Sequence, residues 1–145
     1  MKQLKKYSSE IESIEKGFII SLENTTLKTP SIWQTKKEQN IYRAKMSRAA
    51  GAYIIDLKGA ADILKDLENN KCARIIDWWH NDMIDRKIIK YYWAYPSIVE
   101  QGSHNGLMSS TISTKSSSTK RKISWFFQKA YKTYFRRFFN EKNIY

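Results

Sequence analysis

One apolar pattern, over residues 31–69, constrains the fold of this chain more than any other feature. Apolar side chains recur there at alternating steps of three and four residues, at Tyr42, Met46, Ala49, Tyr53, Leu57, Ala60, Leu64 and Leu67. This spacing places all of them on one face of a helix. A continuous helix of that length would measure roughly 55 Å and would need partners to bury its apolar face. The pattern therefore predicts an all-α protein built on one long helix.

Two glycines in this stretch leave a second interpretation open. Gly51 and Gly59 each cost about 1 kcal/mol relative to Ala inside a helix. A break at either glycine would make residues 52–57 a short strand between two helices. The sequence does not decide whether residues 52–57 are helix or strand.

The segments on either side of the long helix are also predicted to be helical. Ser9 and Glu12 form a capping-box pattern that begins a short first helix, which ends near Asn24. Asn69 and Asn70 suit a turn, after which residues 72–95 continue as an antiparallel partner of the long helix. This third helix is rich in large rings, namely Trp78, Trp79, Tyr91, Tyr92, Trp93 and Tyr95. One face cannot bury so many rings, so some are expected at an interface.

The rest of the chain differs in composition from residues 1–96, the predicted helical domain. Residues 97–120 are polar, basic and rich in Ser and Thr, which predicts a flexible linker. Residues 121–145 are basic and aromatic, with the periodicity of an amphipathic helix. Its apolar arc comprises Ile123, Phe127, Ala130, Tyr131, Tyr134 and Phe138. The fold prediction is therefore a small helical bundle plus a C-terminal amphipathic helix.

The positive charge is concentrated in this C-terminal part. The net charge is +12, and residues 103–145 hold nine Lys and Arg against one acid, Glu141. A single cysteine, Cys72, excludes an internal disulfide framework and is typical of a reducing compartment. The sequence has no apolar run long enough to span a bilayer. We therefore expect the protein in the cytoplasm or inside a viral particle. Separately, the composition rich in Ile, Lys and Asn suggests an AT-rich genome, such as that of a phage or mobile element.

No constellation of residues predicts catalysis, a metal or a cofactor. Cys72 has no assignable His and Asn partners, and no phosphate-binding glycine loop is present. Asp77 and His80 have a metal-like spacing, but a carboxylate-bundle site needs more such pairs. Residues 58–87 also have the turn length of a helix-turn-helix, although Asp77, Asp82 and Asp85 would repel phosphates there. The sequence therefore predicts a non-enzymatic protein.

The best functional prediction is nucleic-acid binding through the C-terminal region. Lys and Arg neutralise phosphates, and nearby rings stack on unpaired bases. The predicted contact residues are Lys120, Arg121, Lys122, Trp125, Lys129, Lys132, Arg136 and Arg137, with Trp125 as the stacking ring. The choice between DNA and RNA stays open.

Three other uses of the same residues remain as alternatives. The aromatic third helix and the C-terminal helix suit a structural or interaction protein, such as a component of a phage particle, a homo-oligomer or another assembly. A helix with rings on one side and basic residues on the other also suits an anionic membrane surface. Finally, the apolar arc could simply pack on the chain's own domain while the basic face remains solvated.

Overall fold

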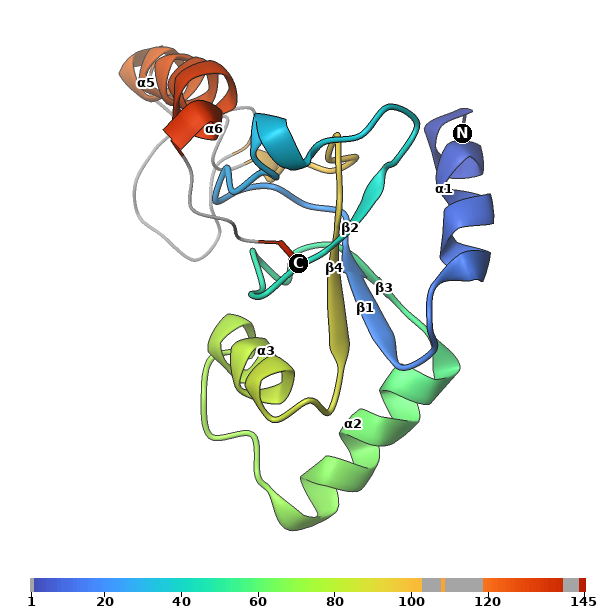
Figure 1. Ribbon diagram of the computed structural model, residues 1–145. Coiled ribbons are helices and arrows are strands. Elements are labelled where there is room, and N and C mark those ends of the chain that lie inside the picture. The colour runs from blue at the N-terminus through green and yellow to red at the C-terminus, as the bar shows by residue number, and fades with distance from the viewer. Residues whose placement is uncertain (1, 103–107, 109–118, 140–143) are drawn as a thin grey trace.

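The computed structural model describes residues 2–102, 108, 119–139 and 144–145, and it is an α/β fold (Figure 1). The elements in chain order are α1 (Lys2–Ser13), β1 (Phe18–Ser21), a 3-10 turn (Ile32–Gln34), β2 (Ile41–Arg43), β3 (Tyr53–Ile55), α2 (Leu57–Asn69), α3 (Ile76–Asp85), β4 (Lys90–Ala94), α5 (Thr119–Ala130), a π-helical turn (Tyr131–Phe135) and α6 (Arg136–Phe139). The four strands form one mixed sheet. The prediction of an all-α helical bundle was therefore wrong.

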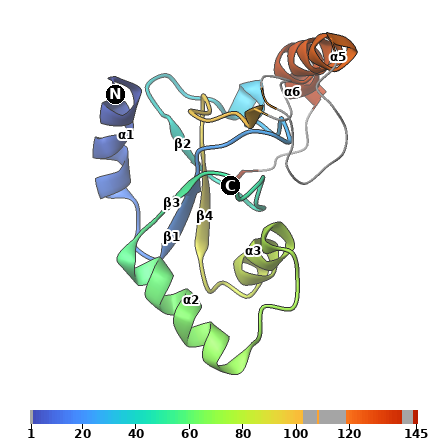
Figure 2. The same cartoon turned by 180° about the vertical axis from the view of Figure 1, so that it is seen from behind.

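The sheet is organised around a central parallel pair of strands. Its order is β2-β4-β1-β3, and β1 runs parallel to β4 with Ile19 opposite Tyr91 and Ile20 opposite Tyr92. The outer strands pair antiparallel, β3 with β1 and β2 with β4. Helix α1 lies on one side of the sheet and α3 on the other (Figures 1 and 2). This arrangement buries the two central strands on both faces.

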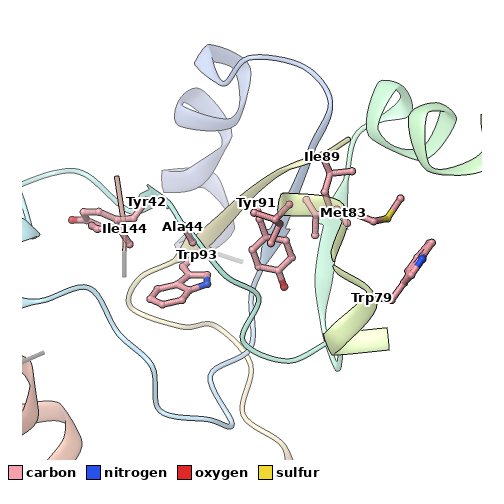
Figure 3. Close-up of a cluster of buried hydrophobic side chains, with 10 residues drawn as sticks. Tyr42, Ala44, Trp79, Met83, Ile89, Tyr91, Trp93 and Ile144 are labelled. Atoms are coloured by element: carbon pink, nitrogen blue, oxygen red, sulfur yellow. The ribbon is translucent and has the colours of Figure 1, made fainter. Parts of the chain in front are cut away.

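The larger core lies between the sheet and α3. Tyr91 and Trp93 of β4 point toward this face, where α3 supplies Trp79 and Met83 (Figure 3). Ile19 of the neighbouring strand β1 belongs to the same cluster. Burying a large apolar side chain of this kind contributes about 1.5–3 kcal/mol, so this cluster is a main source of stability.

The smaller core lies between the sheet and α1. The alternate residues of the central strands, including Phe18, Ile20 and Tyr92, point toward Tyr7 of α1. The Tyr7 hydroxyl donates to the Pro96 carbonyl at 2.9 Å, which ties α1 to the segment after β4. Both cores depend on the period-two alternation of strand side chains.

The largest difference from the prediction concerns the long helix over residues 31–69. Only its last third, α2, is helical, and Leu57 and Leu64 of the predicted seam face solvent. Gly51 instead lies where the chain passes close to the buried Glu23 carboxylate, with which a Cβ at this position would collide. The alternative interpretation of residues 52–57 was the correct one, since β3 occupies Tyr53–Ile55.

Asp56 fixes the point at which α2 begins. Its carboxylate accepts from the backbone N–H groups of Gly59 at 2.9 Å, Phe18 at 2.8 Å and Gly17 at 3.0 Å. Burial alone would raise the pKa of Asp56, but these three donors outweigh it and lower the pKa below the usual value. One N-cap residue thus joins the start of α2 to the start of β1.

The other two predicted helices are also shorter in the structure. The third ends as α3 at Asp85, since Lys87 adopts a left-handed conformation (φ 60°) and the Ile88 N–H donates to the Met83 carbonyl at 2.9 Å. Lys90–Ala94 is then a strand and not helix. Likewise, the first predicted helix is helical only as far as Ser13, and Phe18–Ser21 is a strand.

The end of the chain returns to the α/β domain. Ile144 is buried in the larger core and pairs with Ala44, and the Tyr145 N–H donates to the Arg43 carbonyl at 3.0 Å. Most of the predicted linker, residues 97–120, lies outside the described residues. The last residues of the chain are thus part of the fold.

The burial of His80 in the fold predicts that the free energy of unfolding depends on pH. His80 is buried in α3 with ring centroids of Tyr53 and Tyr91 at 5.9 and 5.8 Å. Burial lowers the pKa of His80 below 6.5, against an opposing effect of Asp77. The unfolded chain therefore binds more protons than the folded one once the pH falls below about 6.5. We expect the free energy of unfolding, measured by urea titration, to fall by up to ~1.4 kcal/mol per pH unit there.

Two single-histidine variants separate this effect from other titrations. The variant His80→Leu should show a flatter profile between pH 7.5 and 5.5, while His104→Gln should keep the wild-type slope. Equal slopes in wild type and His80→Leu would show that His80 does not cause the dependence.

Candidate nucleic-acid interface

Residues 119–139 form one continuous helix, the C-terminal helix, made of α5, the π-helical turn and α6. The predicted helix over residues 121–145 is thus helical over residues 121–139, whereas Ile144 and Tyr145 are not helical. Its last turn packs against the 3-10 turn, with the Trp33 and Phe138 rings 6.3 Å apart, edge to face. Arg137 anchors it, because its Nε donates to the Pro30 carbonyl at 3.0 Å and its Nη1 donates to the Tyr95 hydroxyl at 2.6 Å.

The C-terminal helix docks through its basic side. Lys129 pairs with Glu100 at 2.8 Å, and the Lys132 ammonium donates to the Thr26 carbonyl at 3.4 Å. Trp125 is half-buried on the same side. Of the apolar arc, Phe138 contacts the domain at Trp33, but the basic side makes the polar contacts, so the alternative in which the basic face remains solvated was wrong.

Most of the apolar arc faces solvent. Its exposed members are Ile123, Phe127, Tyr131, Tyr134 and Phe138, and the neighbouring rings Phe126, Phe135 and Phe139 are exposed as well. Exposed fractions range from 51% for Phe138 to 86% for Phe139. A contiguous exposed surface of large apolar rings is typical of a binding surface and not of an ordinary solvated helix.

The predicted contact residues separate into two groups. Lys120, Lys122 and Arg136 are exposed, whereas Lys129 and Arg137 are engaged in docking the helix. The side chain of Arg121 lies outside the described residues. Lys132 is half-buried and Trp125 is partly covered, so Trp125 is less accessible to a base than the exposed rings.

Lys132 is part of a cluster of like charges that we call the basic triad, Lys28, Lys132 and Arg136. Burial lowers the pKa of Lys132 first, and the positive charges of Arg136 and Lys28 lower it further. Among the residues that the structure describes, no carboxylate pairs with any member of the triad. Three unpaired cations held together are stabilised by a bound anion.

Exposed rings lie next to two members of the triad along the helix. Tyr131 and Phe135 stack with their centroids 6.4 Å apart and their planes 15° from parallel, and they are 60% and 65% exposed. Each directly precedes a basic residue, Lys132 or Arg136. Residues adjacent in sequence lie on different faces of a helix, so the exposed rings border the basic triad from the solvent side while Lys132 faces the domain.

A cleft of about 460 Å³ adjoins Lys28 on the α/β domain. It runs along α3, and Lys45 and Trp78, which is 64% exposed, also line it. Its walls include Asp77 and Asp85 as well. The cleft thus places another exposed ring near the basic triad.

Sequence reasoning missed a buried polar cluster centred on Arg48. The Nη2 of Arg48 donates to the carbonyls of Ser21 at 2.9 Å and Ala94 at 3.2 Å, which end the parallel strands β1 and β4. Burial lowers the pKa of Arg48 to about 10, while the nearby Tyr91 and Glu23 oppose this shift. The guanidinium remains charged at neutral pH but is occupied by backbone carbonyls, so its role is to join the two strands.

The remaining candidate groups do not form a chemical centre in the described part of the chain. His80 is enclosed by rings, and Cys72 is an exposed free thiol. Within residues 2–102, 108, 119–139 and 144–145, no three His, Cys, Asp or Glu side chains are grouped closely enough to hold a metal ion. Within the same residues, none of the helices has the length and apolar character needed to cross a bilayer.

Comparison with known proteins gives no further assignment, since the chain matches no protein-family model, no curated protein sequence and no solved structure.

Proposed function

We propose that this protein is a non-enzymatic accessory protein that binds single-stranded nucleic acid through its C-terminal helix. The basic triad would neutralise phosphates, and Tyr131, Tyr134 and Phe135 would stack on unpaired bases. The observation that carries the proposal is the basic triad beside exposed rings: the Lys132 ammonium lies on the Thr26 carbonyl, two residues from Lys28, and Arg136 follows one turn later on the C-terminal helix. Rings that stack on any base, combined with phosphate contacts, give binding that tolerates many sequences.

Single strands fit this surface better than duplexes. Bases of a duplex are already stacked on each other, so they do not offer their faces to protein rings. The cleft beside Lys28 provides a further exposed ring, Trp78, for an unstacked base of the same strand. The main stacking groups are therefore the exposed rings Tyr131, Tyr134 and Phe135, in place of the partly covered Trp125.

The proposal is tested by fluorescence anisotropy of a labelled single-stranded 15-mer and a hairpin duplex. Replacing both Tyr131 and Phe135 with Ala should weaken single-strand binding by at least about 30-fold, because each base–ring stack contributes roughly 1–3 kcal/mol and two stacks are lost. Duplex binding should change much less.

A matched pair of exposed apolar residues serves as the control. Ile123 and Phe126 lie on another part of the same helix surface and are 53% and 68% exposed. Their double replacement by Ala should leave oligonucleotide affinity within about twofold of wild type. Equal losses in the two double variants would show only general dependence on apolar surface, and unchanged affinity in the Tyr131 and Phe135 variant would contradict the proposal.

A second candidate function rests on the exposed apolar residues of the C-terminal helix that the basic triad does not border. Ile123, Phe126 and Phe127 are exposed together, as expected of a surface that binds another protein. An apolar complex of this kind should persist at 1 M salt, where an electrostatic complex with nucleic acid dissociates. Sedimentation of the full chain at low and high salt distinguishes the two functions.

A further inference from the structure

Helix α2 lies at the end of the molecule opposite the C-terminal helix (Figure 1), and a lysine-lined cleft adjoins it. Its volume is about 440 Å³, and α2 forms one wall. The turn before β1 and the turn between α3 and β4 form the others. The cleft is therefore built from three segments that are distant in sequence, and it shares no residue with the basic triad.

Lysine dominates the charge of this cleft. Its lysines are Lys16, Lys58, Lys65, Lys87 and Lys90. The acidic residues that line it, Asp62 and Asp66, already have partners: Asp62 pairs with Lys58, and Asp66 accepts two hydrogen bonds from Arg86 at 2.6 and 2.8 Å. The acids thus do little to neutralise the remaining lysines.

Three of the lysines have no carboxylate partner in the described part of the chain. These are Lys16, Lys65 and Lys87, whereas Lys90 pairs with Glu15 at 2.5 Å. Each unpaired lysine comes from a different wall of the cleft. Unpaired cations around a cavity lower the free energy of an anion that binds there.

The backbone holds two of these lysines at defined turns. Gly17 has φ 89°, a left-handed value that favours glycine, and its N–H is bound by the Asp56 carboxylate at 3.0 Å, which fixes the turn that carries Lys16. Lys87 itself has φ 60° at the end of α3. The backbone positions of Lys16 and Lys87 are therefore fixed before any ligand binds.

We propose that this cleft binds the phosphate groups of a ligand with several phosphates, such as a pyrophosphate or triphosphate. Lysine is a common phosphate-binding residue, acting as a mobile point charge. Three unpaired lysines from different walls can each meet a separate phosphate oxygen, which favours a polyphosphate over a single carboxylate. The phosphates can belong to a free small molecule or to the backbone of a bound nucleic acid.

Titration calorimetry of the full-length protein with sodium tripolyphosphate at low salt tests the proposal. Wild type should bind, and the variant Lys16→Gln, Lys65→Gln, Lys87→Asn should bind at least about tenfold more weakly, because it lacks the three unpaired charges. Asn at residue 87 keeps a side chain that tolerates the left-handed conformation. The control variant Lys36→Gln, Lys37→Gln, Arg74→Gln removes the same charge from exposed residues elsewhere and should bind like wild type.

A second arm uses the labelled single-stranded oligonucleotide and identifies the source of the phosphates. Tripolyphosphate binding that is lost only in the cleft variant, with unchanged oligonucleotide affinity, supports a free phosphorylated ligand. Loss of oligonucleotide affinity in the cleft variant and not in the control supports a nucleic-acid backbone in the cleft. If the cleft variant matches the control in both arms, the proposal is overturned, whatever the outcome for the C-terminal helix.

Discussion

Replacing Lys28, Lys132 and Arg136 together with Gln should weaken single-strand binding by about tenfold or more at low salt. Each phosphate contact to a single strand contributes about 0.7 to the slope of log affinity against log salt concentration. Loss of three contacts should therefore make that slope shallower by about 2. Anisotropy titrations over a salt series measure the affinity and the slope in the same experiment.

The variant Lys36→Gln, Lys37→Gln, Arg74→Gln removes an equal charge from exposed sites outside the basic triad. It should keep a slope close to that of wild type. A slope that falls equally in both variants would mean that net charge, and not the triad, attracts the oligonucleotide. An unchanged slope in the triad variant would contradict the assignment of the site.

Replacing Arg48 with Met should destabilise the fold by about 3–5 kcal/mol. The guanidinium donates to the carbonyls of Ser21 and Ala94 and lies 5.1 Å from the centre of the Trp93 ring. Methionine would leave both carbonyls without this donor and the buried Glu23, which is 1% exposed, without the nearby positive charge. Urea unfolding of wild type and variant measures the difference in the free energy of unfolding.

Two further variants show whether the cause is the buried charge. Arg74→Met, at an exposed position, should change stability by less than about 0.5 kcal/mol. Adding Glu23→Gln to Arg48→Met should recover part of the loss, because it removes the carboxylate that Arg48 leaves behind. A loss below about 1 kcal/mol in Arg48→Met would contradict the structural role of this residue.

The sequence predicted the C-terminal helix but not the side on which it docks. Its amphipathic period is local, so it can be recognised from consecutive residues alone. The docking depends on distant partners: Arg137 binds the Pro30 carbonyl, and Lys129 pairs with Glu100. No local pattern indicates that these basic side chains face the domain while the rings face solvent.

The sheet was missed because its central strands are buried on both faces. Such strands carry continuous apolar runs, here residues 18–20 and 91–94, and they lack the alternation of polar and apolar residues that marks a half-buried strand. Short runs of this kind cannot be distinguished from buried helix by periodicity. The pairing of Ile19 with Tyr91 joins residues far apart in the chain and leaves no local signal.

The sites were predictable only in part for the same reason. Lys132 and Arg136 belong to a basic helix that composition reveals, whereas Lys28 lies in a polar loop about a hundred residues earlier in the chain. The cleft lysines come from three separate segments, and each alone resembles an ordinary surface lysine. Tertiary structure brings these charges together.

Ultraviolet crosslinking of the full-length protein to a single-stranded oligonucleotide that contains 5-bromouracil tests the central claim most directly. Mass spectrometry then identifies the crosslinked residues. We expect crosslinks at Tyr131, Tyr134 and Phe135, the exposed rings near the basic triad. Crosslinks found only outside Thr119–Phe139, or none under conditions that saturate binding, would contradict the proposal that the C-terminal helix is the nucleic-acid interface.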